Sequence, residues 1–221
     1  MAREYLFWHA ASVADIPSSP GFIPPAIDHQ LIAVAGISCT DEIVDHNDAP
    51  VVVWASVSPH PATLVERIDQ AIGQALCGEA PTVVTFSGRM YGYPVVRANA
   101  LRTSTTAHAV FQIPDSANYD LLEVFSADLH QKLRFNEMLE VCGLPARLEL
   151  DVVKAWKEGQ KRQIGLRLIA DVALLALAFI HRQQTSASWN PVWSKAFHAA
   201  ILQAAQLKCP PLKQLFDKQG V

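Results

Sequence analysis

Residues 168–180 form the longest apolar stretch of the 221-residue chain, and this stretch contains a single charged residue, Asp171. A helix that spans a bilayer needs about 20 consecutive apolar residues, so the stretch is too short to cross a membrane. It lies within a segment, 160–182, that has the length of a long helix. The sequence therefore predicts a helix buried in a globular core, and no membrane association.

The composition favours one compact globular domain. Half of the residues are apolar and 18% are charged, against about 25% charged in an average domain. These values exclude disorder, a coiled coil or a supercharged nucleic-acid coat as a description of the whole chain. Residues 1–60 carry one base and seven acids, whereas residues 168–221 carry five bases and two acids. The mildly basic C-terminal part permits contact with phosphates but does not require it, and on charge alone we favour an ordinary solvated surface.

The order of apolar runs along the chain predicts an α/β fold. Apolar or β-branched runs predict strands at 5–9, 31–37, 51–57 and 82–86. Apolar spacing and capping residues predict helices at 64–76, 94–101, 121–129, 136–141, 152–158 and 160–182, and a last helix around residues 193–204. Three strands, then alternating helix and strand, then a helical C-terminus is the element order of a ribonuclease H-like fold. We therefore expect a mixed sheet, with three antiparallel strands followed by parallel strands, flanked by helices.

The four cysteines are far apart and form no CxxC pair. This spacing is typical of reduced thiols rather than of a disulfide framework or a zinc site. The first residues also lack the long apolar core of a secretory signal. We expect a cytoplasmic protein.

Residues 83–101 read VVTFSGRMYGYPVVRANAL. This run resembles the second exonuclease motif of the PolB-like 3′-5′ exonucleases, a family of the DEDD superfamily with the ribonuclease H-like fold. Further stretches resemble the same family in the same order, so that the resemblance extends over roughly residues 5–182; they are 7–15, 24–37, 119–121, 135–145 and 168–172. The resemblance implies a ribonuclease H-like exonuclease-type domain over residues 1–183, followed by a helical extension over residues 184–221.

The resemblance also implies where metal ligands belong. A DEDD nuclease holds two divalent ions, and such hard ions prefer carboxylate oxygens. Carried over by position, three of the four family carboxylates fall on His9, Ala11 and Gly92, and only Asp171 is kept. The chain is thus similar to a degenerate family member that has lost the two-metal site, with no cofactor expected.

Arg167 stands where the family has a Tyr or His that orients the attacking water. Its guanidinium could replace a metal's positive charge and hold Asp171 as an ion pair. Such pairing would explain an acid inside the apolar stretch; the alternative is that Asp171 faces solvent near the start of the helix.

Three functions remain open on this basis. The first is a pseudo-exonuclease that binds single-stranded DNA or RNA, or acts as a scaffold, in nucleic-acid processing. Its candidate nucleic-acid contacts are Ser87, Gly88, Arg89, Arg97 and Arg167. The second is a divergent but active 3′-5′ exonuclease that uses Mg²⁺ or Mn²⁺ with Asp171, Asp120 and one other acid, such as Asp15. The third is a protein-interaction subunit, or a homo-oligomer, that associates through the aromatic residues of the C-terminal helices.

Overall fold

The computed structural model describes residues 3–14, 25–40 and 51–217. Asp15 and most of the two connections expected at 16–25 and 40–50 lie outside these residues. The order of elements in the described part starts with strands and ends with helices, as the sequence predicts.

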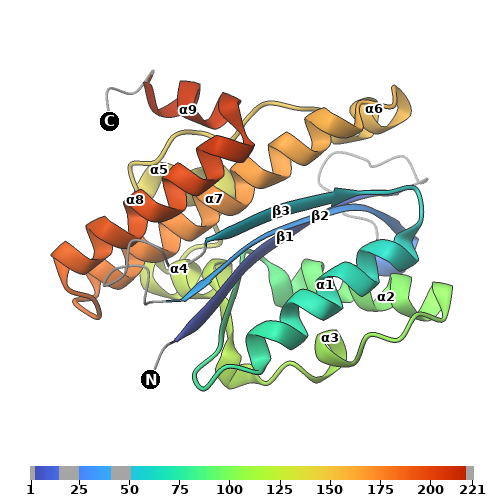
Figure 1. Ribbon diagram of the computed structural model, residues 1–221, viewed down its shortest axis with the longest axis horizontal. Coiled ribbons are helices and arrows are strands. Elements are labelled where there is room, and N and C mark those ends of the chain that lie inside the picture. Colours follow the sequence, from blue (N-terminus) through green and yellow to red (C-terminus); the bar gives the residue numbers. More distant parts are fainter. Residues whose placement is uncertain (1–2, 15–24, 41–50, 218–221) are drawn as a thin grey trace.

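A five-stranded mixed sheet forms the centre of the molecule (Figure 1). Its strands lie in the order β3 (Val52–Val57), β2 (His29–Thr40), β1 (Glu4–Ala14), β4 (Thr82–Thr85) and β5 (Asn118–Asp120). β1, β2 and β3 pair antiparallel, whereas β4 is parallel to both β1 and β5. The expected arrangement of antiparallel and then parallel strands is confirmed.

β1 is longer than the predicted run at 5–9, because its pairing with β2 continues through Ala14. The last residues of β1 are small or polar and carry little strand signal of their own, so the neighbouring strand determines their extended conformation. The register shifts between Ala11 and Ser12. A shift of this kind bends the strand locally and changes the direction of its side chains.

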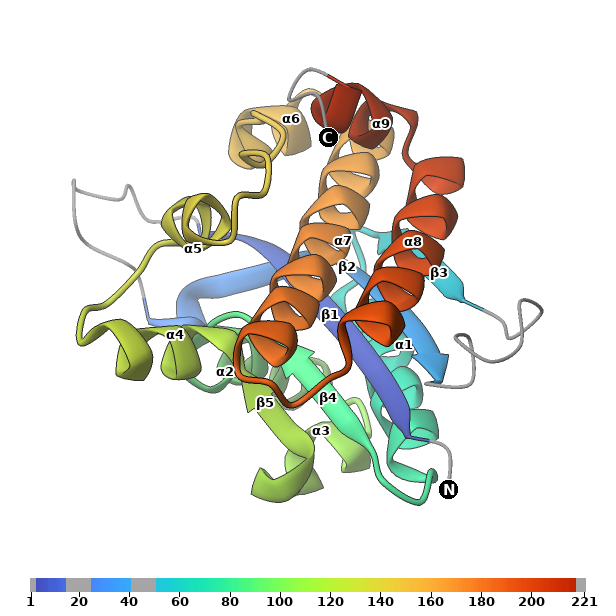
Figure 2. The same ribbon diagram turned by 90° about the vertical axis from the view of Figure 1, so that its left-hand side faces the viewer.

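Helices cover both faces of the sheet, and each face has its own apolar core (Figures 1 and 2). One face carries α1 (Pro61–Leu76), α2 (Tyr93–Thr103) and α3 (His108–Gln112). The other face carries α7 (Lys161–Thr185), with α8 (Pro191–Lys208) lying beside α7. Successive β1 residues serve the two cores alternately: Phe7 packs towards α7 and Trp8 towards α2.

The remaining helices are short. They are α4 (Leu121–Leu129), α5 (Phe135–Val141), α6 (Val152–Lys157) and α9 (Pro210–Asp217). Asp151 caps α6 by accepting the Lys154 N–H at 3.0 Å, as its position in the sequence predicts. No helix is predicted from the sequence at α9, which begins with Pro210 and Pro211; prolines are well tolerated in a first helical turn.

α7 is long and apolar enough to cross a membrane by length and composition alone. In this structure, however, 83% of its most apolar window is buried inside the protein. It packs against β1, β2, β3 and β4, so that its apolar surface is covered by the sheet. The prediction of a buried core helix is confirmed.

Aromatic contacts pack α8 against β1 and against Trp189, which precedes α8. Phe197 is fully buried, and its ring centroid lies 5.5 Å from that of Tyr5 and 5.4 Å from that of Trp189. At the end of α8, the Cys209 thiol donates to the Leu166 carbonyl oxygen of α7 at 3.3 Å. The described part of the C-terminal segment therefore packs on the body of the domain.

Candidate functional site

Asp171 lies on α7 and is 1% exposed. The Nε of Arg167, one helical turn earlier, lies 2.9 Å from Oδ1 and 3.0 Å from Oδ2 of Asp171. The spacing of four residues on one helix brings the two side chains together. The expected ion pair is present, and Asp171 does not face solvent.

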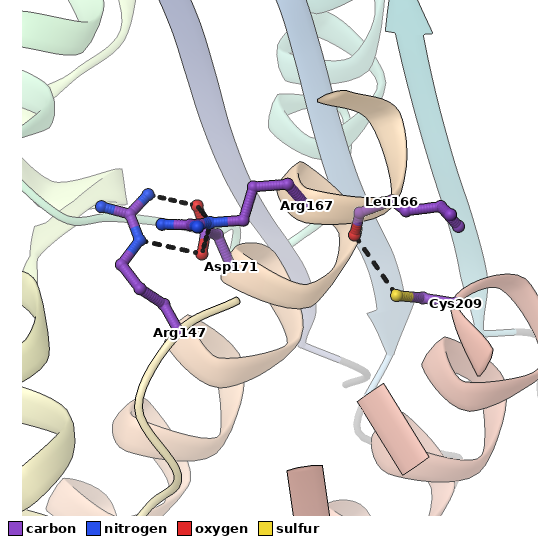
Figure 3. A network of polar contacts seen from close by, with 5 residues as sticks. All are labelled: Arg147, Leu166, Arg167, Asp171 and Cys209. Carbon is purple, nitrogen blue, oxygen red and sulfur yellow. Dashed lines mark hydrogen bonds and ion pairs between the residues drawn. The ribbon is translucent and has the colours of Figure 1, made fainter. Parts of the chain in front are cut away.

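A second arginine, Arg147, binds the same carboxylate from the segment that joins α5 to α6 (Figure 3). Its Nε donates to Oδ1 at 3.2 Å, and its Nη2 donates to Oδ2. Burial lowers the pKa of the Arg167 guanidinium, and the nearby Asp171 carboxylate opposes that shift. Since an arginine stays protonated in proteins, the cluster holds two cations and one anion, with the exposed Glu149 as a further acidic neighbour.

His9 extends from β1 into the same region and is uncharged at neutral pH. Its ring stacks on Phe135, with centroids 6.2 Å apart and planes 12° apart. Burial lowers the pKa of His9 from 6.5 to about 4; Asp171 opposes this shift, and Arg147 and Arg167 add to it. His9 therefore adds no charge to the two arginines.

Acid sensitivity of the fold tests this position of His9. The pKa of His9 is lower in the folded chain than in the unfolded chain. As the pH falls below about 6.5, the unfolded chain therefore binds a proton that the native chain does not bind. Stability is then lost between about pH 6.5 and about pH 4. When the pH is lowered from 7 to about 4.5, we expect the free energy of unfolding of His9→Phe to fall by about 2 kcal/mol less than that of the wild type. Urea unfolding at both pH values measures the difference, and parallel pH profiles for the two proteins would contradict it.

Ala11 and Gly92 bring no ligand to the site, as the sequence implies. A Cβ on Gly92 would lie 3.2 Å from Cη2 of Trp8, so a larger side chain there would press on the indole. Within the described residues, no three His, Cys, Asp or Glu side chains are grouped so that they could hold a metal ion. The donors at these four positions are one neutral imidazole and one carboxylate already bound by two arginines, a set that does not suit a pair of hard divalent ions.

Asp120, the other candidate acid, is a buried capping residue. It is 3% exposed and caps α4 by accepting the Leu122 N–H at 3.0 Å. The same carboxylate accepts the N–H of Ser87 at 2.8 Å and of Arg89 at 3.1 Å. Asp120 thus stabilises both the start of α4 and the turn that follows β4.

That turn holds three of the predicted nucleic-acid contacts. Ser87 has a left-handed backbone with φ 60°, and a π-helical turn follows over Gly88–Gly92. Gly88 packs closely on Thr85, because a Cβ there would lie 2.2 Å from the Thr85 Oγ1. The side chain of Arg89 is 39% exposed and makes ion pairs with Asp115 and Glu123 at 3.3 and 3.4 Å. Of these three residues, Arg89 offers the largest charged surface to a partner.

The other two predicted contacts have partners inside the protein. Arg97 donates to the Val110 carbonyl oxygen from Nε at 3.1 Å and from Nη2 at 2.8 Å. Its guanidinium also lies over the rings of Tyr93 and Phe111. Arg167 is 6% exposed and bound to Asp171. Arg167 is thus closed off from the surface, whereas Arg97 is half-buried and has its Nε and Nη2 bound to the backbone.

The sequence does not identify Arg147, Phe135 or Phe86 as part of the site. Phe135 connects the other groups: His9 stacks on it, Phe86 meets it edge-on at 5.1 Å, and the Arg147 guanidinium lies 5.3 Å from its ring centroid. The end of β4 is therefore joined to the Asp171 cluster through aromatic contacts. Arg147 is 24 residues from Asp171 along the chain, so no local spacing could have linked them.

Comparison with solved structures finds a similar fold in a DNA polymerase and in an exonuclease. The chain is similar to a family B DNA polymerase from the archaeon Pyrobaculum calidifontis, with a TM-score of 0.58 and 13% identity over 93% of this chain and 29% of that one. It is similar to E. coli exonuclease I in complex with a 5cy-dT13 oligonucleotide, with a TM-score of 0.50 and 13% identity over 88% of this chain and 42% of that one. The chain thus spans less than half the length of either protein. The ribonuclease H-like, exonuclease-like fold is confirmed.

No family model and no curated protein matches the sequence. The structural likeness therefore defines the class of fold. It leaves the closer resemblance to the PolB-like exonucleases as a hypothesis about the residues described above.

Proposed function

We propose that the chain is an exonuclease-like domain that binds single-stranded nucleic acid, or acts as a scaffold for its processing, without metal-dependent cleavage. The observation that carries this proposal is the state of Asp171, the one acid kept from the implied ligand set. Both of its oxygens accept from arginines, so the carboxylate neutralises protein cations rather than divalent ions. A two-metal mechanism needs several carboxylates that are free to coordinate.

Binding to nucleic acid is supported by the fold and by the accessible arginines. Exonuclease I, which has the same fold, was solved in complex with an oligonucleotide. In the present chain, Arg89 and Arg147 have side chains that are 39% and 31% exposed. The carboxylates that face Arg89 belong to Asp115 and Glu123, which are themselves 94% and 45% exposed. Such exposed pairs contribute little to stability, so a phosphate can compete for the arginine.

The proposal is tested by measuring cleavage and binding on the same preparation of the full chain. Labelled single-stranded DNA and RNA are incubated with Mg²⁺ or Mn²⁺, and binding is followed by fluorescence anisotropy at increasing salt. We expect no shortening of either strand. We also expect affinity to fall as salt rises, with a slope of about −0.7 per phosphate contact.

Arg89→Ala is expected to weaken binding and to reduce the salt slope by about one contact. Arg182→Ala is the matched control, because Arg182 is also a partly exposed arginine that is paired with an acid, Asp128. Cation-dependent trimming that disappears in Asp171→Ala would instead establish an active exonuclease. Absence of binding to both strands at low salt would favour a protein-interaction role.

A further inference from the structure

The cluster around Asp171 has the opposite charge to a metal-binding site. Two guanidiniums surround one carboxylate, and the adjacent His9 is neutral because burial lowers its pKa to about 4. A pocket of carboxylates attracts cations, whereas an excess of guanidinium attracts anions such as phosphate. The buried cluster therefore carries a net positive charge that belongs to the protein itself, which the exposed Glu149 beside it offsets in part.

Arg147 is the part of the cluster that a ligand can reach. Arg167 is buried, whereas the Arg147 side chain is 31% exposed. The Nε and Nη2 of Arg147 donate to Asp171, and its remaining nitrogen, Nη1, points away from the carboxylate (Figure 3). Among the described residues, no hydrogen-bond acceptor or ion-pair partner is found for Nη1.

The outer edge of Arg147 is also held in a fixed orientation. Asp171 holds one edge of the guanidinium through two hydrogen bonds, and the Phe135 ring lies 5.3 Å from its central carbon. A guanidinium fixed in this way loses little conformational entropy when its other edge binds an anion. An arginine edge with two N–H groups matches two oxygens of a phosphate.

We propose that Arg147, positioned by Asp171 and Arg167, is a metal-independent receptor for the terminal phosphomonoester of a nucleic-acid strand. This inference rests on the proposed function, since it names the chemical group that the same site recognises. Near neutral pH a phosphomonoester carries about 1.5 to 2 negative charges, whereas each internal phosphodiester carries one. Because the exposed part of the site is a single fixed guanidinium, the more strongly charged strand end is the preferred ligand.

The test compares strands that differ only at their ends, in buffer that contains EDTA. Three oligonucleotides of the same single-stranded sequence carry a 3′-phosphate, a 5′-phosphate or hydroxyls at both ends. We expect the wild type to bind one or both of the phosphorylated strands about tenfold more tightly than the hydroxyl-ended strand. Comparison of the two phosphorylated strands shows whether the site prefers a 3′-terminal or a 5′-terminal phosphate.

Arg147→Met is expected to lose this preference. It leaves the Arg167–Asp171 pair complete, and a cooperative thermal melt verifies that the variant is folded. Arg182→Met is the matched control: Arg182 is 24% exposed and paired with Asp128, and its loss is expected to leave the preference unchanged. Equal affinity of the wild type for all three strands would overturn the inference while leaving the proposed function intact.

A second measurement tests the receptor without any strand. Inorganic phosphate is expected to raise the unfolding midpoint of the wild type and of Arg182→Met, but not that of Arg147→Met. If no strand binds at all but this difference is observed, the proposed function fails and the phosphate receptor stands. If phosphate stabilises wild type and Arg147→Met equally, the receptor is not at Arg147.

Discussion

Asp171→Asn is expected to lower the free energy of unfolding by about 3–5 kcal/mol. Among the residues that the structure describes, the substitution removes the only anion directly bound to Arg147 and Arg167, and it leaves a buried guanidinium uncompensated. Breaking a buried ion pair from one side is costly, because the remaining charge stays buried without its partner. Urea unfolding of the two proteins at neutral pH measures the change.

Asp128→Asn is the control for this measurement. Asp128 also pairs with an arginine, Arg182, but its side chain is 41% exposed, so the expected loss is below about 1 kcal/mol. A carboxylate kept for metal binding behaves in the opposite way, since removing a functional acid often leaves stability unchanged or raised. An unchanged or increased stability of Asp171→Asn would therefore contradict the structural role assigned here.

Phe197→Ala is expected to destabilise the protein by about 3–5 kcal/mol. Phe197 lies on α8, beyond the expected exonuclease-type domain of residues 1–183, yet it is fully buried against Tyr5 of β1. The Phe197 ring also stacks on the Trp193 ring, with centroids 5.0 Å apart. Its removal leaves a cavity between the sheet and the C-terminal helices, so unfolding is expected to remain a single transition at a lower denaturant concentration.

Leu207→Ala serves as the comparison on the same helix. Leu207 is 79% exposed, so little change in stability is expected. If Phe197→Ala were as stable as the wild type, or if α8 melted alone in a separate early transition, residues 184–221 would be a detachable extension rather than a part of the domain core.

The fold is largely predictable from the sequence because apolar periodicity is strong in the central elements. The apolar run at 168–180 predicts α7, and the order of strand-like runs predicts the mixed sheet. Ends of elements are less predictable, as in β1, where pairing with β2 extends the strand over residues that carry weak strand signals. The π-helical turn at Gly88–Gly92 has no signal beyond its glycines, because its shape depends on Asp120 binding the Ser87 and Arg89 amides.

The candidate site is predictable only where its residues are close in sequence. The Arg167–Asp171 pair follows from helical spacing. Arg147 reaches the same carboxylate from an irregular segment, and Arg97 turns towards Val110 through a contact that no spacing rule describes. Sequence analysis recovers which residue types are present at the implied positions, but the partners that each charge selects depend on tertiary packing.

The close approach of Gly92 to Trp8 has a consequence for engineering. Placing an acid at position 92 requires the indole of Trp8 to shift by a few tenths of an ångström, because a Cβ there would lie 3.2 Å from Cη2 of Trp8. An acid introduced near Asp171 would also have the guanidinium groups of Arg147 and Arg167 as its neighbours. A metal site engineered at these positions therefore requires coordinated changes of Trp8 and of the two arginines, in addition to the new acids.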